Sequence, residues 1–277
     1  MKGRPVARKP LPPGLFALRQ PPPLLVGKGL GAACIAAVLL AWTAATAGAP
    51  ESRLVSPVLL PSPLEVVTSA RSLLAEGSLL EAVVATLRRV LLGFLLSAVV
   101  GVPLGMAAGS WRAFGAFIAP VVLVLRNIPV AALIPLTILW FGIDESQKVM
   151  FIFIATVPFV FSDAAASVIA INDRYVDTAQ TLGASSAQVV TKVLVPLAMP
   201  GVFTSLRSLF GIAFGYIMLA ELMNAKYGLG YLLSMSQRRG HTDHIFLVLV
   251  LIGLLAWGID RALAFFQRGL FPYRNDS

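Results

Sequence analysis

The sequence predicts an all-α fold, a bundle of about six helices that cross a membrane. Of its 277 residues, 57% are hydrophobic and only 13% are charged, whereas soluble domains carry about 25% charged residues. Apolar runs near the length that a helix needs to cross a bilayer, roughly 20 residues, recur along the chain. The expected spans are residues 30–47, 82–108, 114–140, 149–170, 201–222 and 244–266.

Both ends of the chain are expected to lie outside the membrane. Residues 1–28 are rich in proline and basic side chains and contain no acid, a composition typical of a solvated tail. We expect a basic tail at 1–28, a transmembrane domain at 29–270 and a short second tail at 271–277. Ala45-Thr46-Ala47 resembles a signal-peptidase site. The basic region before it is long for a signal peptide, so an uncleaved first span is favoured.

The positive charge of the chain orients the spans. The net charge is +9, and the basic residues are scattered among apolar runs, which fits a membrane protein better than a nucleic-acid binder. Six spans put both termini, the turn at Arg112 and the polar segment 171–196 on one side, which carries about twice as many basic residues as the other. Cytoplasmic loops are enriched in Lys and Arg, so this side is predicted to be cytosolic.

The segment 171–196 is a polar interruption between two long apolar runs. Residues 175–182 are compatible with a helix, and Gly183 can supply a left-handed break after it. A second short helix is expected to follow and to end before Pro196, because proline interrupts the helical hydrogen-bond ladder. The segment therefore predicts a helix–glycine–helix loop in the cytosol.

The second helix of this loop has its own start and end signals. Ser185 or Ser186 can cap it, since serine side chains accept hydrogen bonds from the free N–H groups of a first turn. The helical pattern then continues through Lys192.

Three features within the spans have structural interpretations. Gly101, Gly105 and Gly109 recur every four residues, which lets another helix approach closely. Gly211 and Gly215 have the same spacing, and these glycines can serve packing within one subunit or between two. The pair Arg88-Arg89 is expected to lie near the outer end of its span, with its side chains reaching up to the interface.

The loop resembles a known family motif. Asp177-Thr178-Ala179, three residues, Gly183, nine residues, then Val193-Leu194-Val195-Pro196 is similar to the "EAA" loop of ABC importer permeases, Glu-Ala-Ala, three residues, Gly, nine residues, Ile-x-Leu-Pro. The departures are Asp for Glu, Thr for the first Ala, and Val for both Ile and Leu. In that family the loop couples the permease to the ATP-hydrolysing subunit. The resemblance therefore implies a coupling site made of Asp177, Thr178, Ala179, Gly183, Val193, Val195 and Pro196.

The resemblance covers about residues 55–270 and points to the nitrate/sulfonate/taurine branch of these permeases. It rests on LPSP at 60–63, LRRVLLGF at 87–94, IPL at 134–136 with LWFGI at 139–143, and GLG at 228–230. It implies a type I importer permease fold and a homodimer with the translocation path at its interface. It also implies two cytosolic ATP-binding subunits, which bind ATP and Mg, and a periplasmic or lipid-anchored substrate-binding protein. Substrates across the branch include alkanesulfonates, taurine, nitrate, bicarbonate and some heterocyclic nutrients, so a small anionic nutrient is expected.

Arg126 is a charged residue deep in the third expected span. At 1.5 Å per residue it lies roughly 20 Å from the start of that span, where an unpaired cation costs from about 3 kcal/mol upward. It can form a clamp with Asp163 or a backbone carbonyl, or it can attract an anionic substrate. The family pattern expected at this place is Arg-Pro-x-Pro, and the sequence here is Arg-Asn-Ile-Pro. The candidate path residues are Arg126, Asn127, Pro129, Asp163 and Glu221.

The chain lacks the sequence signature of an ATP site. A P-loop needs Gly, four residues, Gly-Lys and then Ser or Thr, but around Gly27-Lys28 the first glycine is replaced by Pro22 and the hydroxyl residue by Gly29. ATP hydrolysis is therefore expected in a separate subunit, and this chain is expected to be no enzyme and to hold no cofactor or metal. The single Cys34 excludes an intrachain disulfide.

Three alternatives stay open on the sequence alone. His241 and His244 favour a loop or helix-start role over metal binding, because two histidines are a weak ligand set. A secondary transporter coupled to protons or sodium could use Arg126, Asp163 and Glu221 as a relay, although the inverted repeats typical of that class are not evident. A membrane scaffold would need none of these buried charges.

Overall fold

The computed structural model describes residues 22–49, 53–75 and 78–271. The chain forms two compact units, Met1–Val67 and Thr68–Ser277, and each is described by itself. Most of the tail expected at 1–28, and all of the tail expected at 271–277 except its first residue, lie outside the described residues.

The first unit contains α1 (Leu24–Ala45) and the start of α2 (Pro63–Ala75). α1 is long and apolar enough to cross a membrane. It begins before the predicted start at residue 30, because the proline run ends at Pro23, which occupies the N-cap position. Proline is well tolerated at a helix start, where its missing N–H has no partner to lose.

The start of α2 is held by a hydrogen-bonded box and an ion pair. The Glu65 carboxylate accepts a bond from the Ser62 N–H (2.7 Å), and the Glu65 N–H donates to Ser62 Oγ (3.3 Å), which is the capping-box arrangement. The Arg53 guanidinium also binds both carboxylate oxygens, at 2.8 and 3.1 Å. Arg53 and Ser62 together lower the pKa of Glu65 to about 2. The loop between α1 and α2 is therefore tied to the first turn of α2.

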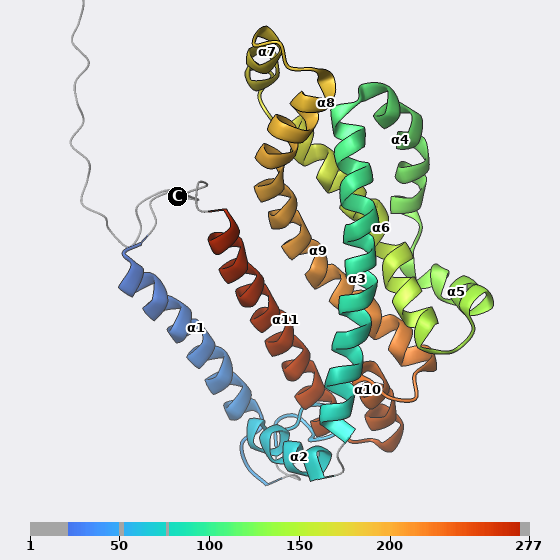
Figure 1. The fold of residues 1–277 in the computed structure, drawn as a ribbon. Helices are drawn as coiled ribbons and strands as arrows, with labels where there is room; N and C mark the ends of the chain where they lie inside the picture. Colours follow the sequence, from blue (N-terminus) through green and yellow to red (C-terminus); the bar gives the residue numbers. More distant parts are fainter. Residues whose placement is uncertain (1–21, 50–52, 76–77, 272–277) are drawn as a thin grey trace, which may run out of the picture. The chain divides into compact units, whose positions relative to one another are not determined.

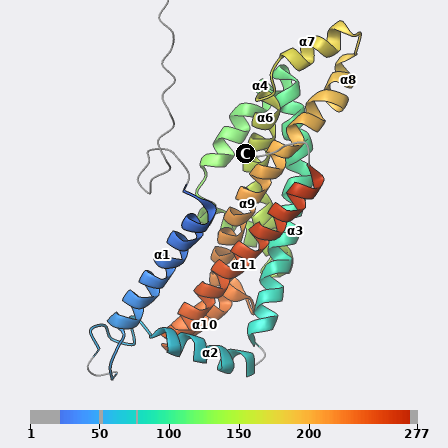
Figure 2. The same cartoon turned by 90° about the vertical axis from the view of Figure 1, so that its left-hand side faces the viewer.

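The second unit is a helical bundle in which α3, α6, α9 and α11 run along one another, with α7 and α8 at one end and α10 at the other (Figures 1 and 2). No strand occurs among the residues that the structure describes. The elements after α2 are α3 (Ser78–Ser110), α4 (Arg112–Asn127), η1 (Val130–Ala132), α5 (Leu133–Phe141), α6 (Glu145–Ile169), α7 (Arg174–Thr181), α8 (Ser186–Val189), η2 (Val190–Leu194), α9 (Val195–Asn224), α10 (Leu229–Arg239) and α11 (Thr242–Leu270).

The number of spans agrees with the prediction. Within the described ranges, 5 helices are long and apolar enough to cross a membrane, and the bent pair α4–α5 raises the number to 6 if it counts as one span. α10 has 11 residues, about 16 Å at 1.5 Å per residue, and is too short to cross. The all-α transmembrane bundle expected from the sequence is therefore confirmed.

The glycines of α3 allow close packing against α6. A Cβ atom added to Gly101 would lie 2.8 Å from Val160 Cγ1, one added to Gly109 would lie 2.6 Å from the Ala165 oxygen, and one added to Gly105 would collide with the Phe161 oxygen. The predicted close approach therefore occurs within the subunit. By contrast, a Cβ atom at Gly211 or Gly215 of α9 would meet nothing within 4 Å, so these two glycines do not serve packing inside this chain.

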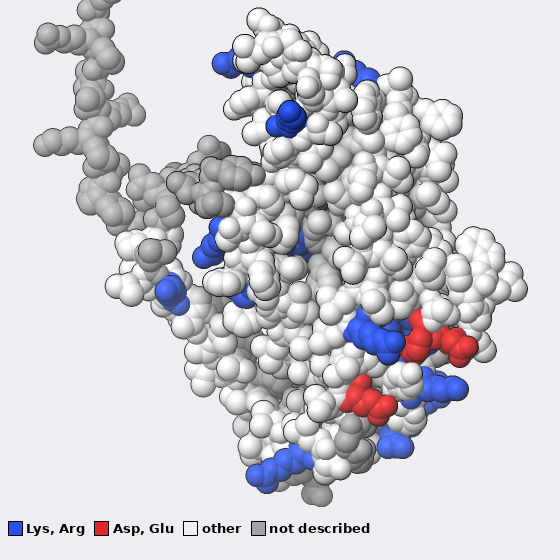
Figure 3. All heavy atoms as spheres, viewed as in Figure 1, with Lys and Arg blue, Asp and Glu red and all other residues white. Residues whose placement is uncertain are grey.

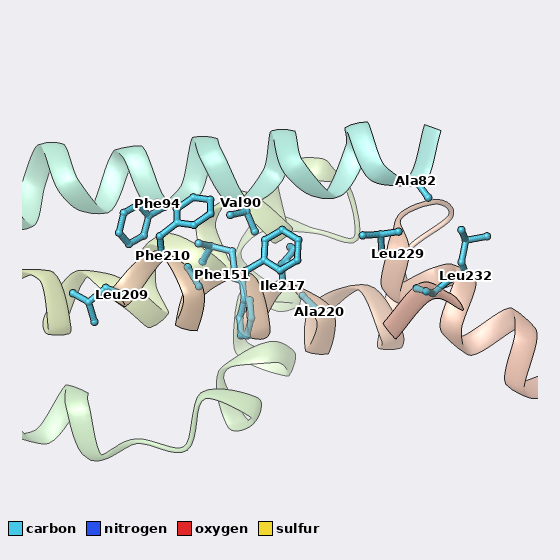
Figure 4. Packing of buried hydrophobic residues seen from close by; sticks show 14 of the residues in the cluster. Ala82, Val90, Phe94, Phe151, Leu209, Phe210, Ile217, Ala220, Leu229 and Leu232 are labelled. Atoms are coloured by element: carbon cyan, nitrogen blue, oxygen red, sulfur yellow. The ribbon is translucent and has the colours of Figure 1, made fainter. Parts of the chain in front are cut away.

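The apolar core of the second unit lies between α3, α6 and α9. Figure 4 shows side chains of α3 and α9, among them Phe94 and Phe210, meeting between the two helices. The rings of Phe94 and Phe210 pack edge to face with centroids 5.3 Å apart, a favoured aromatic geometry. Phe151 of α6 and Ile217 of α9 are fully buried beside them. This core fixes the three helices that carry the sites described below.

The third expected span, 114–140, is broken next to the helix-breaking Arg126-Asn127-Ile128-Pro129. α4 and the segment from Val130 to Phe141 are bent by 88°. The cause is Pro129, which lacks an N–H and disfavours a helical conformation for the residue before it. Ile128 accordingly has φ −69° and ψ 126°. Arg126 therefore lies in the last turn of α4, next to the bend.

The prediction that the helical pattern ends before Pro196 is wrong. α8 continues through the five-residue π-helix η2 into α9, and Pro196 lies in the first turn of α9. The wider π-turn changes the pattern of backbone hydrogen bonds at this point. Proline is tolerated in a first helical turn because an N–H there has no partner within the helix. The 171–196 loop is thus joined rigidly to a helix that runs the length of the bundle.

Candidate functional site

The 171–196 loop has the helix–glycine–helix form predicted from the sequence. α7 ends at Thr181, and Gly183 has φ +84°, a left-handed conformation that glycine adopts without strain. Ser185 then caps α8: its Oγ accepts from the Gln188 N–H (3.4 Å), and its own N–H donates to Gln188 Oε1 (2.8 Å). Of the two serines considered, Ser185 is therefore the cap.

The loop has one packed face and one exposed face. Val176 and Ala179 of α7, with Val195 of α9, pack against a core cluster at the ends of α3, α6 and α9. The opposite face carries Tyr175, which is 55% exposed, and Leu182, which is 82% exposed. The outward face of the loop therefore offers two large side chains that are not used for packing inside this chain.

The motif residues are distributed over both faces of the loop. Ala179, Val193 and Val195 are half-buried, and Val193 lies within η2. The exposed members are Asp177, Thr178, Gly183 and Pro196. The motif thus combines residues that anchor the loop with residues that face outward.

Arg126 is exposed on the surface of the second unit, beside the bend between α4 and α5. Its guanidinium carbon lies 5.1 Å from the centre of the Phe159 ring, within the range of a cation–π contact. No ion pair joins it to Asp163 in the described structure, although Asp163 is half-buried nearby on α6. The ion-pair form of the clamp is thus absent, and the cation is open on one side.

The other expected path residues have separate positions. The Asn127 side chain donates to the Leu123 oxygen (2.7 Å) and so binds the last turn of its own helix. Pro129 precedes η1 and causes the bend. Glu221 is buried at the far end of α9 and does not lie beside Arg126.

Arg89 is fully buried, which corrects the expectation that it reaches the membrane interface. It is 1% exposed, and its Nη1 donates to Glu221 Oε1 (2.6 Å) and to the Tyr227 oxygen (2.9 Å). Its Nε and Nη2 donate to the two oxygens of Glu145, at 2.6 and 2.5 Å. Arg88 beside it is exposed, as expected. The Arg89 cluster, defined as Arg89, Glu145, Glu221, Thr86 and the segment 227–230, therefore connects α3, α6, α9 and the start of α10.

Backbone groups complete the Arg89 cluster. Glu221 accepts from the Thr86 hydroxyl (2.9 Å) and from the Gly230 N–H (2.9 Å). Gly228 has φ +123°, and a Cβ atom there would lie 2.6 Å from the Glu221 carboxylate. Only glycine therefore lets the chain pass over the ion pair. A buried charge without a partner is strongly destabilising. In this cluster each buried charge has an oppositely charged partner and further hydrogen bonds.

Sequence reasoning missed this cluster because its members lie far apart in the chain. The contacts of Arg89 join residues separated by 56, 132 and 138 positions. One signal was present: a predicted span with an arginine inside it, and acidic residues near the same ends of two other spans. In Figure 3 a mixed group of acidic and basic side chains is visible at this end of the bundle, near α5 and α10.

A second polar cluster joins α9 to α11. Arg207 donates to Asp260 Oδ1 at 2.8 and 3.1 Å and to Gln267 Oε1 at 2.9 Å. The Gln267 amide in turn donates to Thr204 Oγ1 (2.7 Å). This cluster attaches the last helix of the bundle to its centre.

The two histidines lie at the start of α11. His241 is the N-cap residue of this helix, which agrees with the helix-start role predicted for it. Candidate ligand atoms of His241, Asp243 and His244 lie within 4.8 Å of one another. The His241 and His244 rings are stacked with centroids 4.9 Å apart, and His244 Nε2 lies 3.2 Å from Ser72 Oγ.

Comparison with known proteins identifies similar chains. A family profile described as "Binding-protein-dependent transport system inner membrane component" matches residues 101–272. The chain is 36% identical to a probable ABC transporter permease protein of Brucella abortus (strain 2308), over 91% of this chain and 98% of that protein. It is 31% identical to the taurine transport system permease protein TauC of Escherichia coli (strain K12), over 87% of this chain and 88% of TauC. Other similar proteins bear the names of aliphatic sulfonate and nitrate import permeases.

A solved structure has the same fold. A chain from the inward-facing MetNI methionine ABC transporter superimposes with a TM-score of 0.65 and 22% sequence identity, covering 70% of this chain and 97% of that chain. At this identity the likeness concerns the fold alone.

Proposed function

Because this chain belongs to the family of binding-protein-dependent transport system inner membrane components, we propose that two copies of it enclose the translocation path of an importer for a small anionic nutrient. The chain is a multi-pass membrane protein and the permease of an ABC importer, from the branch that contains the taurine, sulfonate and nitrate permeases. The names of those relatives support a sulfonate, taurine, nitrate or similar anion as the substrate.

Separate subunits complete the proposed importer. Two cytosolic subunits bind ATP and Mg and hydrolyse the ATP, and a periplasmic or lipid-anchored protein delivers the substrate. This chain then needs no cofactor and catalyses no reaction. The excess of basic residues on the side of the 171–196 loop supports an orientation with this loop and both termini in the cytosol.

The 171–196 loop is the proposed contact with the ATP-binding subunit. The observation that carries this proposal is its two-faced packing: Val176 and Ala179 attach it to the bundle, while Tyr175 and Leu182 project outward. The π-turn joins the loop to α9 without a flexible break. A movement of the ATP-binding subunit against Asp177, Thr178, Gly183 or Pro196 would therefore reach α9 directly, through Val193 and Val195.

A charge placed on the exposed face of the loop tests this contact. Leu182→Asp should leave the permease folded but lower the amount of ATP-binding subunit that co-purifies with it at least tenfold, because a carboxylate would be buried in the contact. Leu64→Asp is the matched control, since Leu64 is 73% exposed on α2. Equal co-purification of the two variants would contradict the proposed contact.

The translocation path is proposed to pass Arg126. A cation exposed on the surface of a membrane protein at this depth requires a protein or water environment, and the interface between two copies would provide one. The glycines at 211 and 215, which pack against nothing in this chain, support a second copy on α9. Asn127 and Pro129 hold the bend that presents Arg126, and Asp163 on α6 is the acidic residue whose charge interacts with that of Arg126. Glu221 stays a prediction as a path residue, and its burial in the Arg89 cluster favours a structural role.

A further inference from the structure

A pocket of about 330 Å³ lies where α9 meets α10, at the end of the bundle opposite α7 (Figure 1). Its apolar wall includes Ile143 from the loop before α6 and Met235 from α10. Its polar lining consists of Lys226, Tyr231, Ser234 and Arg238. This α9–α10 pocket is at the small end of the range of ligand pockets, about 300–1,000 Å³, and so suits a small solute.

The polar side chains of the α9–α10 pocket are free donors. Within the described part of the chain, none of the four makes a hydrogen bond or an ion pair, and no acidic side chain lines the pocket. Lys226 and Arg238 are exposed, while Tyr231 and Ser234 are half-buried. An ammonium group, a guanidinium group and two hydroxyl groups around one cavity favour an anion with several acceptor oxygens.

The Arg89 cluster explains why this pocket stays positive and open. Glu145 and Glu221, two acidic residues of its framework, are both bound to Arg89, and neither lines the pocket. The same bonds fix the pocket walls: Glu145 holds the loop that carries Ile143, and the Tyr227 oxygen and Gly230 N–H hold the turn between Lys226 and Tyr231. Because its walls are fixed in this way, the backbone of the pocket needs little reordering when a solute binds.

We infer that the α9–α10 pocket is a binding site for a small oxyanion such as a sulfonate, where the anion binds before it reaches Arg126. This inference rests on the proposed function, in which this end of the bundle faces outward and the substrate is an anion. The guanidinium of Arg238 can bind two oxygens of one sulfonate, and Lys226 supplies a second positive charge. The same chemistry would also suit a carboxylate on the substrate-binding protein, so the test separates a free anion from a protein side chain.

The test measures whether methanesulfonate binds directly to the assembled permease–ATPase complex in lipid nanodiscs, in the absence of the binding protein. Saturation transfer from the complex to the methanesulfonate methyl group reports weak binding by nuclear magnetic resonance. The variant Lys226→Gln/Arg238→Gln should lower this signal at least fivefold. Arg239→Gln is the matched control, because Arg239 is exposed next to Arg238 but does not line the pocket; its signal should match that of the unmodified complex.

Each other result overturns the inference. Three results would show that the pocket does not select an oxyanion. They are an unchanged signal in the double variant, an equal loss of signal in Arg239→Gln, and no signal from the unmodified complex. An unchanged signal together with a loss of binding-protein-stimulated ATP hydrolysis would assign the pocket to a carboxylate of the binding protein. ATP-driven uptake by the unmodified complex is measured in parallel. Normal uptake with a failed pocket test would leave the proposed function standing, whereas absent uptake of every anion would reject that function itself.

Discussion

Arg89 and Arg126 are two arginines of one transmembrane bundle with opposite surroundings. Arg89 is 1% exposed and bound to two carboxylates, whereas Arg126 is exposed, forms no ion pair in the described part of the chain, and lies over the ring of Phe159. A buried, paired cation belongs to the framework of the bundle. An open cation deep in a membrane protein is expected to have a functional partner. The two residues therefore lead to different predictions.

Arg89→Met should destabilise the permease strongly. It leaves Glu221 buried without its cation, and breaking one side of a buried pair costs about 3–5 kcal/mol, which corresponds to a fall of roughly 10 °C in the thermal unfolding midpoint. Arg88→Met, on the exposed neighbour, should change the midpoint little. The double variant Arg89→Met/Glu221→Met should recover part of the loss, because it removes the unpaired charge. A double variant less stable than Arg89→Met would contradict this account of the cluster.

Arg126→Gln should separate transport from folding. We expect a folded complex with normal basal ATP hydrolysis and at least tenfold slower uptake, since glutamine cannot attract an anion. Arg126→Lys, which keeps the charge, should retain more uptake than Arg126→Gln. A structural clamp would predict a different result, namely poorly folded protein that Asp163→Asn partly rescues. Uptake by Arg126→Gln at the unmodified rate would end the path proposal.

At the scale of single elements, the 171–196 loop was largely predictable, whereas the size of the bend in the third span was not. The loop is encoded by local signals, Gly183 for the break and Ser185 for the cap, which act over a few residues. Pro129 was visible in the sequence as a helix breaker, but a proline can kink a helix slightly or, as here, accompany a bend of 88°. Packing of α5 against α6 decides between these outcomes, and packing is not readable from a local pattern.

Gly183→Val should uncouple ATP hydrolysis from transport. Valine resists φ +84° at a cost of roughly 1 kcal/mol or more, so the turn between α7 and α8 should rearrange. We expect normal membrane insertion with loss of binding-protein-stimulated ATP hydrolysis. Gly240→Val is the matched control, because Gly240 has φ +75° and equal free space but ends α10 at the other end of the bundle. Similar loss in both variants would indicate general destabilisation and not a coupling defect.

At the scale of the whole molecule, composition and span length were sufficient for the fold class. Hydropathy identifies the spans because a bilayer requires long apolar helices with satisfied backbones. The contacts between helices were much less accessible. The role of Gly101, Gly105 and Gly109 in packing followed from their spacing, whereas the Arg89 cluster joins residues up to 138 positions apart, and no local pattern shows which of them pair. Buried polar networks of this kind depend on which helix faces meet, and only the folded chain shows that.

The central claim is that this chain imports a small anion at the expense of ATP hydrolysed by a partner subunit. The most direct test is uptake of radiolabelled taurine and nitrate into proteoliposomes that contain the purified permease–ATPase complex, with the binding protein outside and ATP inside. We predict uptake of one of these anions or of a closely related sulfonate that requires internal ATP, persists when proton and sodium gradients are abolished, and falls at least tenfold in Arg126→Gln. Uptake that needs an ion gradient and proceeds without ATP would contradict the claim and would favour an ion-coupled secondary transporter.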